Sequence, residues 1–262
     1  MDNRRIQTGE HTGNFRCFIL SGGDYTTKVI ACYVVFNEEE NIARSIRSVK
    51  AYVDGVVIVD ACFKSNTKYG AEITHSTDNT MDAAIDACKD IPLEYIEAHT
   101  RLNEQEARNL YLRCIEEGDW ALYIDGDEVL YGEYSSINSM FKDIHQGVYN
   151  ECISCRVYTE VIKYAGMGVD MPRREFDENP IINTCGFMSK LFRMKKGHHY
   201  ITEGRVTEHA IYDKDDVLVT TGMLNRTCSF FIINHHLRQS HESYQNDGVW
   251  ALNQRPWDKK ST

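Results

Sequence analysis

Three acidic side chains follow an apolar run near the middle of the chain, in the sequence YIDGDEVL at 123–130. Asp125 and Asp127 are separated only by Gly126, which leaves the backbone free to turn so that both carboxylates approach one point. Mg²⁺ and Mn²⁺ accept a few carboxylate oxygens and fill their other positions with water or substrate phosphate. The spacing therefore indicates a metal and diphosphate site, and the alternative for so short a pattern is a solvated turn.

The elements that must position these acids are predicted from the hydrophobic pattern. Apolar runs predict four strands, at 28–36, 55–60, 93–98 and 120–125, and apolar residues at helical spacing predict a helix in each interval between them. This alternation is typical of right-handed crossovers. We therefore expect an α/β fold whose mostly parallel sheet has helices on both faces.

Capping residues define where these helices are expected to begin. Asn37 with Glu40 predicts the start of the first helix, and Asp78 predicts the start of the second. Asn103 with Glu106 repeats the signature before the third.

The second half of the chain has a different pattern. One helix is predicted around 135–144, and it is followed by four β-like runs, at 152–164, 187–194, 216–221 and 229–237. We expect a single domain over 1–262, in which 28–130 binds a nucleotide sugar and the mixed, β-rich half at 131–262 binds an acceptor.

Polar residues gather at one edge of the predicted sheet. The segment NEEEN at 37–41 follows the first strand, Asp60 ends the second, and DGDE at 125–128 follows the fourth. Ligands of such sheets bind outside the carboxyl ends of the strands. The three segments therefore predict one site.

Composition restricts the partners. The chain has a formal charge of −10 with its Lys and Arg scattered, which argues against nucleic acid and anionic membranes. Its apolar runs are shorter than a membrane span, and no signal peptide follows Met1. The nine cysteines are odd in number and dispersed, as buried free thiols are. We expect a soluble, cytoplasmic protein.

The motifs of the first half resemble those of family 2 glycosyltransferases with the GT-A fold, especially the lipopolysaccharide-core glucosyltransferase-like branch. In the order of that family, the chain has VVFNEEENIARSIRSV, VVIVD, STDNT, EARNLYL and WALYIDGDEVL, which includes its D-x-D motif. One departure is an insertion at 61–75, between Asp60 and Ser76, where the family continues almost at once. The insertion leaves two possibilities open, an altered nucleotide preference and a neighbouring surface.

The resemblance implies roles for residues of the first half. Phe36 and Glu38 would line the nucleoside pocket, Asp60 would hydrogen-bond the base, and Arg108 would help to hold the donor. Each has a structural alternative: Glu38 as a residue of the first helical turn, Asp60 as a loop cap and Arg108 as an exposed helix charge.

The acidic turn receives its roles in the same way. Asp125, with Gly126 beside it, would contact the ribose or a metal-bound water, and Asp127 would ligate the metal. His236, at the end of the last strand, would lie near the metal or the diphosphate. Adjacent side chains of a strand point to opposite faces, so that at most one of His235 and His236 would reach the site.

A stretch of the second half resembles the family element that ends in V-H-E, which here is V-T-E-H. Glu208 then takes the position of the base that deprotonates the acceptor hydroxyl, and His209 is its rival. The alternative is a surface acid beside a strand end.

The resemblance as a whole implies a metal-dependent, inverting hexosyltransferase. It would move a sugar from a nucleoside-diphosphate sugar to a hydroxyl of a glycan or glycolipid, with Mn²⁺ or Mg²⁺ as cofactor. One alternative is a sugar-nucleotide pyrophosphorylase, although the acidic segment at 36–41 lacks the basic, Gly-rich signature that holds a triphosphate. The other is a non-catalytic sugar-nucleotide or carbohydrate-binding relative.

Overall fold

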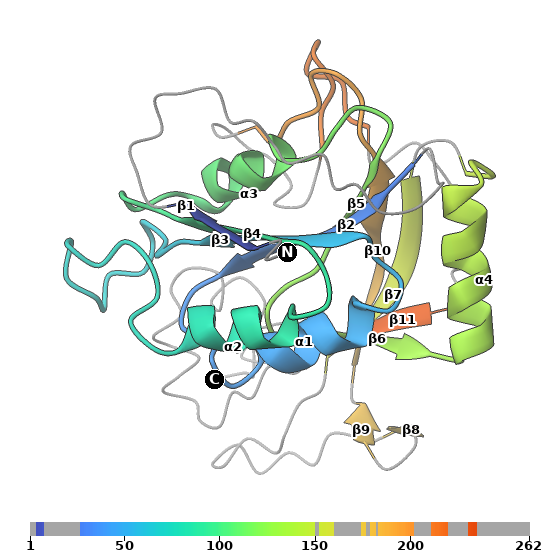
Figure 1. Cartoon of the computed structure of the whole chain (residues 1–262), viewed down its shortest axis with the longest axis horizontal. Helices are drawn as coiled ribbons and strands as arrows, with labels where there is room; N and C mark the ends of the chain where they lie inside the picture. The colour runs from blue at the N-terminus through green and yellow to red at the C-terminus, as the bar shows by residue number, and fades with distance from the viewer. Residues whose placement is uncertain are drawn as a thin grey trace, which may run out of the picture.

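The computed structural model describes residues 4–7, 27–149, 152–159, 174–176, 179–181, 183–201, 211–219 and 230–234. A nine-stranded sheet runs through both halves of the chain (Figure 1). Its parallel part consists, in spatial order, of β1 (Arg4–Gln7), β4 (Leu93–Glu97), β3 (Gly55–Asp60), β2 (Val29–Val35) and β5 (Trp120–Tyr123). The four predicted strands of the first half are therefore confirmed.

The sheet continues from β5 with strands that are mostly antiparallel. Their spatial order is β10 (Asn183–Arg193), β7 (Cys152–Thr159), β11 (Phe230–Asn234) and β6 (Glu128–Gly132). Only the pair of β7 with β11 is parallel in this part. A separate two-stranded sheet joins β8 (Arg174–Phe176) to β9 (Asn179–Ile181). The run at 216–221 was predicted as a strand, but in its described part it makes only an isolated bridge between Tyr212 and Leu218.

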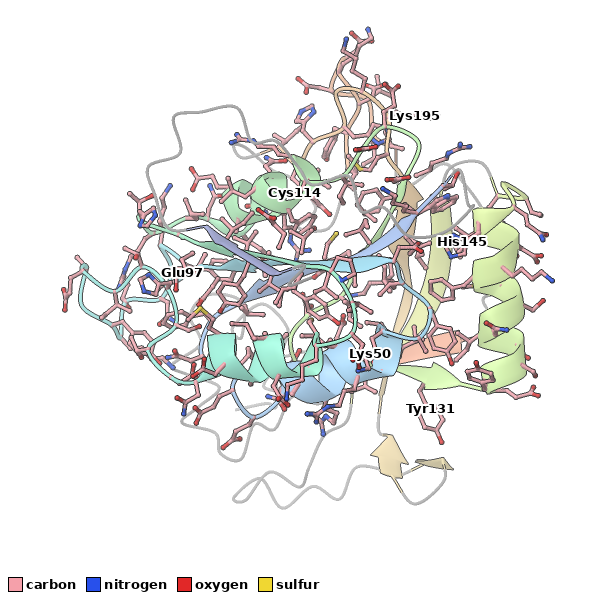
Figure 2. The ribbon with its side chains drawn as sticks, in the orientation of Figure 1. Lys50, Glu97, Cys114, Tyr131, His145 and Lys195 are labelled. Carbon is pink, nitrogen blue, oxygen red and sulfur yellow. The ribbon has the colours of Figure 1, made fainter. Side chains whose placement is uncertain are left out.

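Helices cover both faces of the parallel part (Figure 1). Two of them, α1 (Ile42–Val49) and α2 (Thr80–Ala87), lie on one face, and α3 (Glu104–Leu112) lies on the other. Figure 2 shows Lys50, after α1, and Cys114, after α3, on opposite sides of the sheet. A fourth helix, α4 (Tyr134–His145), packs beside β6 and β7. The predicted α/β fold class is confirmed.

The core has two apolar layers, one for each face of the sheet. Ile42 and Ile46 of α1 pack in the same buried cluster as Ala84 of α2, whereas Ala107 and Leu110 of α3 belong to the other cluster. Val, Ile and Leu fill the strands between them, as expected for strands covered on both sides. Within the described residues, no helix is long and apolar enough to cross a membrane.

The helix starts agree with the predicted caps in one case and differ in another. Asn103 and Glu106 form the complete capping box of α3. Asn37 does not cap α1, which begins at Ile42 after Asn41. Asn37 has a left-handed φ of 54°, and its side-chain oxygen accepts instead from the backbone N–H of Thr77 at 2.8 Å. The prediction for Asn37 was wrong because a tertiary contact competes for the same side chain.

Candidate functional site

The acidic turn packs against the segment that follows β2. A Cβ atom placed on Gly126 would lie 3.0 Å from Cγ of Glu38 and 3.3 Å from Cγ1 of Val35, which is closer than ordinary contact. Glycine therefore lets the two segments approach closely without displacing the side chains of Glu38 and Val35, and its φ is not left-handed. The structure brings Glu38 and Gly126 together at the carboxyl edge of the sheet, as the sequence predicts.

Asp125 is held in place by several hydrogen bonds. Its Oδ1 accepts from the hydroxyl of Tyr123 at 2.7 Å, and its backbone N–H donates to Oε2 of Glu128 at 2.9 Å. Its backbone carbonyl also accepts from Oγ of Ser45, on α1, at 3.3 Å. The Asp125 side chain remains 33% exposed to solvent, although Tyr123 holds one of its oxygens. Asp127 follows on the same turn and is only 8% exposed.

Arg108 lies beneath this turn. It is 2% exposed, and its guanidinium donates to Glu104, one helical turn earlier, and to the hydroxyl of Tyr123. The guanidinium carbon lies 3.8 Å from the centre of the Tyr123 ring, and Nη2 lies 3.8 Å from Oδ1 of Asp125. The alternative of an exposed helix charge is therefore wrong, and Arg108 reaches Asp125 chiefly through Tyr123.

One atom of Arg108 differs from the rest of this network. Its Nη1 is buried and has no hydrogen-bond partner among the described residues. An unsatisfied buried donor of this kind costs about 1–3 kcal/mol, and more when the group is charged. A buried donor of this kind calls for a partner, which a ligand, an ion or an ordered water would supply.

A second buried pair supports the turn from the side of the antiparallel strands. Lys190 of β10 and Glu128 are 1% and 2% exposed, and Nζ of Lys190 lies 2.9 Å and 2.7 Å from the two carboxylate oxygens. Nζ also lies 4.0 Å from the centre of the Tyr123 ring, which therefore contacts two cations. Burial raises the pKa of Glu128, and Lys190 opposes that rise.

Lys190, Glu128 and Tyr123 were not among the predicted site residues. A signal for Lys190 was nevertheless present, since it interrupts the apolar run at 187–194 next to buried Leu191 and Phe192. A lysine at a buried strand position needs a partner. In the structure this partner is Glu128, the last residue of the motif D-G-D-E.

Asp60 is 2% exposed and accepts three internal hydrogen bonds. Its Oδ1 accepts from the backbone N–H and the hydroxyl of Ser76 at 2.8 Å and 2.7 Å, and its Oδ2 accepts from the hydroxyl of Tyr95 at 2.9 Å. Burial raises the pKa of Asp60, and these hydrogen bonds oppose the rise. The loop-capping alternative is therefore realised, and contact of Asp60 with a base stays a prediction.

Phe36 and Glu38, in the segment that follows β2, are half-buried. The centre of the Phe36 ring lies 4.9 Å from the centre of the Tyr69 ring, and the two ring planes make an angle of 84°. The backbone N–H of Glu38 donates to the hydroxyl of Thr80 at 2.7 Å, and its carboxylate accepts from Asn41 at 3.1 Å. Since α1 begins only at Ile42, Glu38 is not a residue of its first turn.

The structure allows a test of whether a divalent cation fits these residues. Asp125 and Asp127 offer hard carboxylate oxygens, and Mg²⁺ is typically held by one or two carboxylates together with substrate phosphates. The described residues contain no group of three His, Cys, Asp or Glu that could hold a metal by themselves. The donor set fits a cation shared with a diphosphate. Glu208, His209 and His236 lie outside the described residues.

Comparison with known proteins gives similarity to solved structures only. No family model matches the chain. No curated protein matches it in sequence either. The crystal structure of S. aureus TarS is similar with 20% identity and a TM-score of 0.35, over 55% of this chain and 23% of TarS. TarS 1–349 in complex with UDP is similar with 22% identity and a TM-score of 0.34, over 58% and 40% of the two chains.

Glucosyl-3-phosphoglycerate synthase from Mycobacterium tuberculosis, in complex with Mn²⁺, UDP-glucose and phosphoglyceric acid, is also similar. The identity is 16% and the TM-score 0.35, over 55% of this chain and 46% of the synthase. The matches thus cover less than half of each of these three solved chains.

Proposed function

We propose that this chain is a metal-dependent, inverting glycosyltransferase of family 2 that uses a nucleoside-diphosphate sugar as donor. One observation carries the proposal: the turn with Asp125 and Asp127 lies at the carboxyl edge of a parallel sheet, packed through Gly126 against Glu38. The lipopolysaccharide-core branch, the glycan or glycolipid acceptor and the single domain over 1–262 belong to the same proposal and follow from the sequence resemblance.

The chain's own residues would share the work of donor binding. Asp127 would hold Mn²⁺ or Mg²⁺, which when bound offsets the negative charge of the departing nucleoside diphosphate, and Asp125 would contact the ribose or a metal-bound water. Tyr123 keeps Asp125 in one orientation through the 2.7 Å hydrogen bond. Phe36, Glu38 and Asp60 would hold the nucleoside.

Arg108 would act mainly by positioning. Its buried charge faces Tyr123 and Asp125, and the low polarity of the surroundings makes such interactions stronger than in water. Its Nη1 has no hydrogen-bond partner among the described residues. A donor oxygen that reaches the turn would be a suitable acceptor.

The acceptor side of the proposal rests on the resemblance of the second half. Glu208 would remove the proton of the acceptor hydroxyl as its oxygen attacks the anomeric carbon, with His209 as the rival base. His236 would contribute to the metal or diphosphate site. One displacement would invert the anomeric carbon.

Calorimetric titration tests the donor site. UDP, GDP, ADP, CDP and their common sugar derivatives are titrated with and without Mn²⁺ into the native chain, Asp127→Asn and a control, Asp90→Asn. Asp90 is an exposed acid in the loop before β4, at the opposite edge of the sheet. Metal-dependent binding of one nucleotide, lost in Asp127→Asn and kept in Asp90→Asn, would support the proposal. Binding that ignores both the metal and Asp127→Asn would contradict it.

Turnover separates a transferase from a non-catalytic relative. Hydrolysis of the bound donor in the absence of acceptor, or transfer to a screened acceptor, is expected for the native chain. Glu208→Gln should keep donor affinity and lose transfer, whereas His209→Gln should keep both. The reverse result would assign the base to His209, and donor binding without any turnover would favour the non-catalytic alternative.

A further inference from the structure

The insertion at 61–75 forms a closed loop at the carboxyl edge of the sheet. At its neck the backbone N–H of Cys62 donates to the carbonyl of Thr74 at 2.7 Å. One residue beyond the insertion, Ser76 donates both its backbone N–H and its hydroxyl to Asp60, the last residue of β3. The loop leaves and rejoins the sheet at one place, as compact surface loops do.

Arg101 fastens this loop from outside. Its guanidinium donates to four backbone carbonyls of the loop, at distances between 2.5 Å and 3.1 Å, namely those of Asn66, Tyr69, Gly70 and Ile73. Backbone carbonyls that would otherwise require water are thereby satisfied by one planar side chain. The path of the loop is set by the segment that follows β4, where Arg101 lies.

Two further contacts join the loop to the same region. The backbone N–H of Lys64 donates to the carbonyl of Leu102 at 2.8 Å, and Nζ of Lys64 lies 2.7 Å from the carboxylate of Glu106. Phe63 also forms a β-bridge with Leu102. The loop is thus held by interactions within the protein alone, before any ligand binds.

The tip of the loop faces the segment that follows β2. The hydroxyl of Tyr69 accepts from Nδ2 of Asn37 at 3.2 Å, and its ring meets that of Phe36 edge to face at 4.9 Å. Both rings are half-buried and keep part of their surface open. The insertion therefore adds a second aromatic ring to the place where the nucleoside is proposed to bind.

We propose that Tyr69 is a specificity-determining residue that contacts the nucleobase of the donor, and that Arg101 is the positioning residue that holds it there. The inference rests on the proposed function, since it concerns the base of the same nucleotide. An aromatic ring offers a stacking surface to any base, and a loop fixed at four carbonyls has little freedom to adapt. Tyr69 on this fixed loop then favours binding of the nucleobase whose size and hydrogen-bonding edge fit the space beside Phe36.

The test compares ligands with and without a base. UDP, CDP, GDP and ADP with Mn²⁺, and inorganic pyrophosphate with Mn²⁺, are titrated into the native chain, Tyr69→Ala, Tyr69→Phe and a control. The control is Thr67→Ala, an exposed position of the same loop. Tyr69→Ala should bind the preferred nucleotide about tenfold more weakly, because it removes the stacking surface, and should bind pyrophosphate as the native chain does. Tyr69→Phe should lie within about threefold of the native chain.

Arg101→Lys tests the positioning role. The lysine keeps the charge but cannot donate to four carbonyls, so the ratio of affinities between the preferred nucleotide and the others should fall by about fivefold or more. Pyrophosphate affinity should stay constant, which a general loss of structure would not allow.

The outcomes separate this inference from the proposed function. If the native chain binds a nucleotide and Tyr69→Ala binds all nucleotides with unchanged affinity, the role of Tyr69 is overturned and the donor site stands. If Tyr69→Ala loses nucleotide and pyrophosphate equally, Tyr69 acts through the fold and not on the base, which also overturns the role. If the native chain binds no nucleotide while remaining folded, both proposals fail together.

Discussion

The hydroxyl of Tyr123 lies 2.7 Å from Oδ1 of Asp125 and donates to it, while the same hydroxyl accepts from Arg108. One phenol thus joins a buried cation to the first acid of the D-G-D turn. Its ring also contacts Lys190, the partner of Glu128. Charged groups from α3, β6 and β10 meet around Tyr123 of β5, so that four elements together position the acids.

Tyr123→Phe should loosen Asp125 while leaving the ring and its contacts with the cations in place. We expect a loss of about 1–2 kcal/mol in the free energy of unfolding, because a hydrogen bond to a charged group is removed and Arg108 loses an acceptor. Metal-dependent nucleotide affinity should fall about fivefold. Urea unfolding and calorimetry measure the two effects. Tyr52→Phe, a half-buried tyrosine stacked on Phe141, is the matched control, and equal effects in both variants would contradict the prediction.

The pair of Lys190 and Glu128 should show strong coupling. Lys190→Met leaves a buried carboxylate without its cation, and Glu128→Gln leaves a buried ammonium without its anion, so each should cost about 3–5 kcal/mol of unfolding free energy. The double variant should cost less than the sum of the two. Chemical denaturation of the four proteins gives the coupling energy. Additive losses would mean that the two charges do not depend on each other.

Gly126→Ala should act by contact with the residue opposite. The added Cβ would meet Cγ of Glu38 at 3.0 Å, and Gly126 does not have a left-handed φ, so that backbone strain is not involved. We expect about 1–3 kcal/mol of destabilisation, as for overpacking elsewhere, and weaker metal-dependent nucleotide binding. In the background of Glu38→Ala the same glycine substitution should cost distinctly less stability. An undiminished cost in that background would show that Glu38 is not the obstacle.

Asp60 should make stability depend on pH in a defined direction. Burial raises the pKa of Asp60 in the folded state above the ordinary value of 3.8. In the interval from about pH 4 up to the folded pKa, the folded state holds a proton that the unfolded state has lost. The contribution of Asp60 to stability is therefore present below pH 4 and is lost as the pH rises through the folded pKa.

Asp60→Asn removes this titration. Urea unfolding at intervals from pH 4 to pH 7 should give the native chain a component of unfolding free energy that falls with pH, and the variant should lack it. The comparison of slopes isolates Asp60 because all other carboxylates are shared. Parallel curves for the two proteins would contradict the assignment.

The sequence predicts the parallel part of the fold well because its signals are local. Buried strands such as 55–60 are continuous apolar runs between loops, and the capping box of Asn103 and Glu106 needs only four successive residues. Asn37 fits a local capping pattern equally well. Asn37 does not cap the helix because its side-chain oxygen accepts instead from the backbone N–H of Thr77, 40 positions later.

The residues that hold the candidate site in place are harder to predict from the sequence, because their contacts are also distant along the chain. The acids at 125–128 are visible as a motif, but Lys190 reaches Glu128 across 62 positions, and Arg101, which lies after β4, reaches Tyr69 of the insertion across 32 positions. Long-range pairs of this kind leave no periodic pattern. A charged residue inside an apolar strand shows that a partner is needed, and the fold decides which one it is.

The strand order has a consequence for how the protein is made. Although β5 and β6 are joined directly by the acidic turn, β10, β7 and β11 lie between them in the sheet, and among the described strands β6 pairs with β11 alone. Closing such distant pairs costs chain entropy before the contacts repay it. A chain emerging from the ribosome can form its parallel strands early, but Glu128 lacks Lys190 and β6 lacks its partner strand until 183–193 and 230–234 have been synthesised. We expect the cation site to be among the last parts of the molecule to mature.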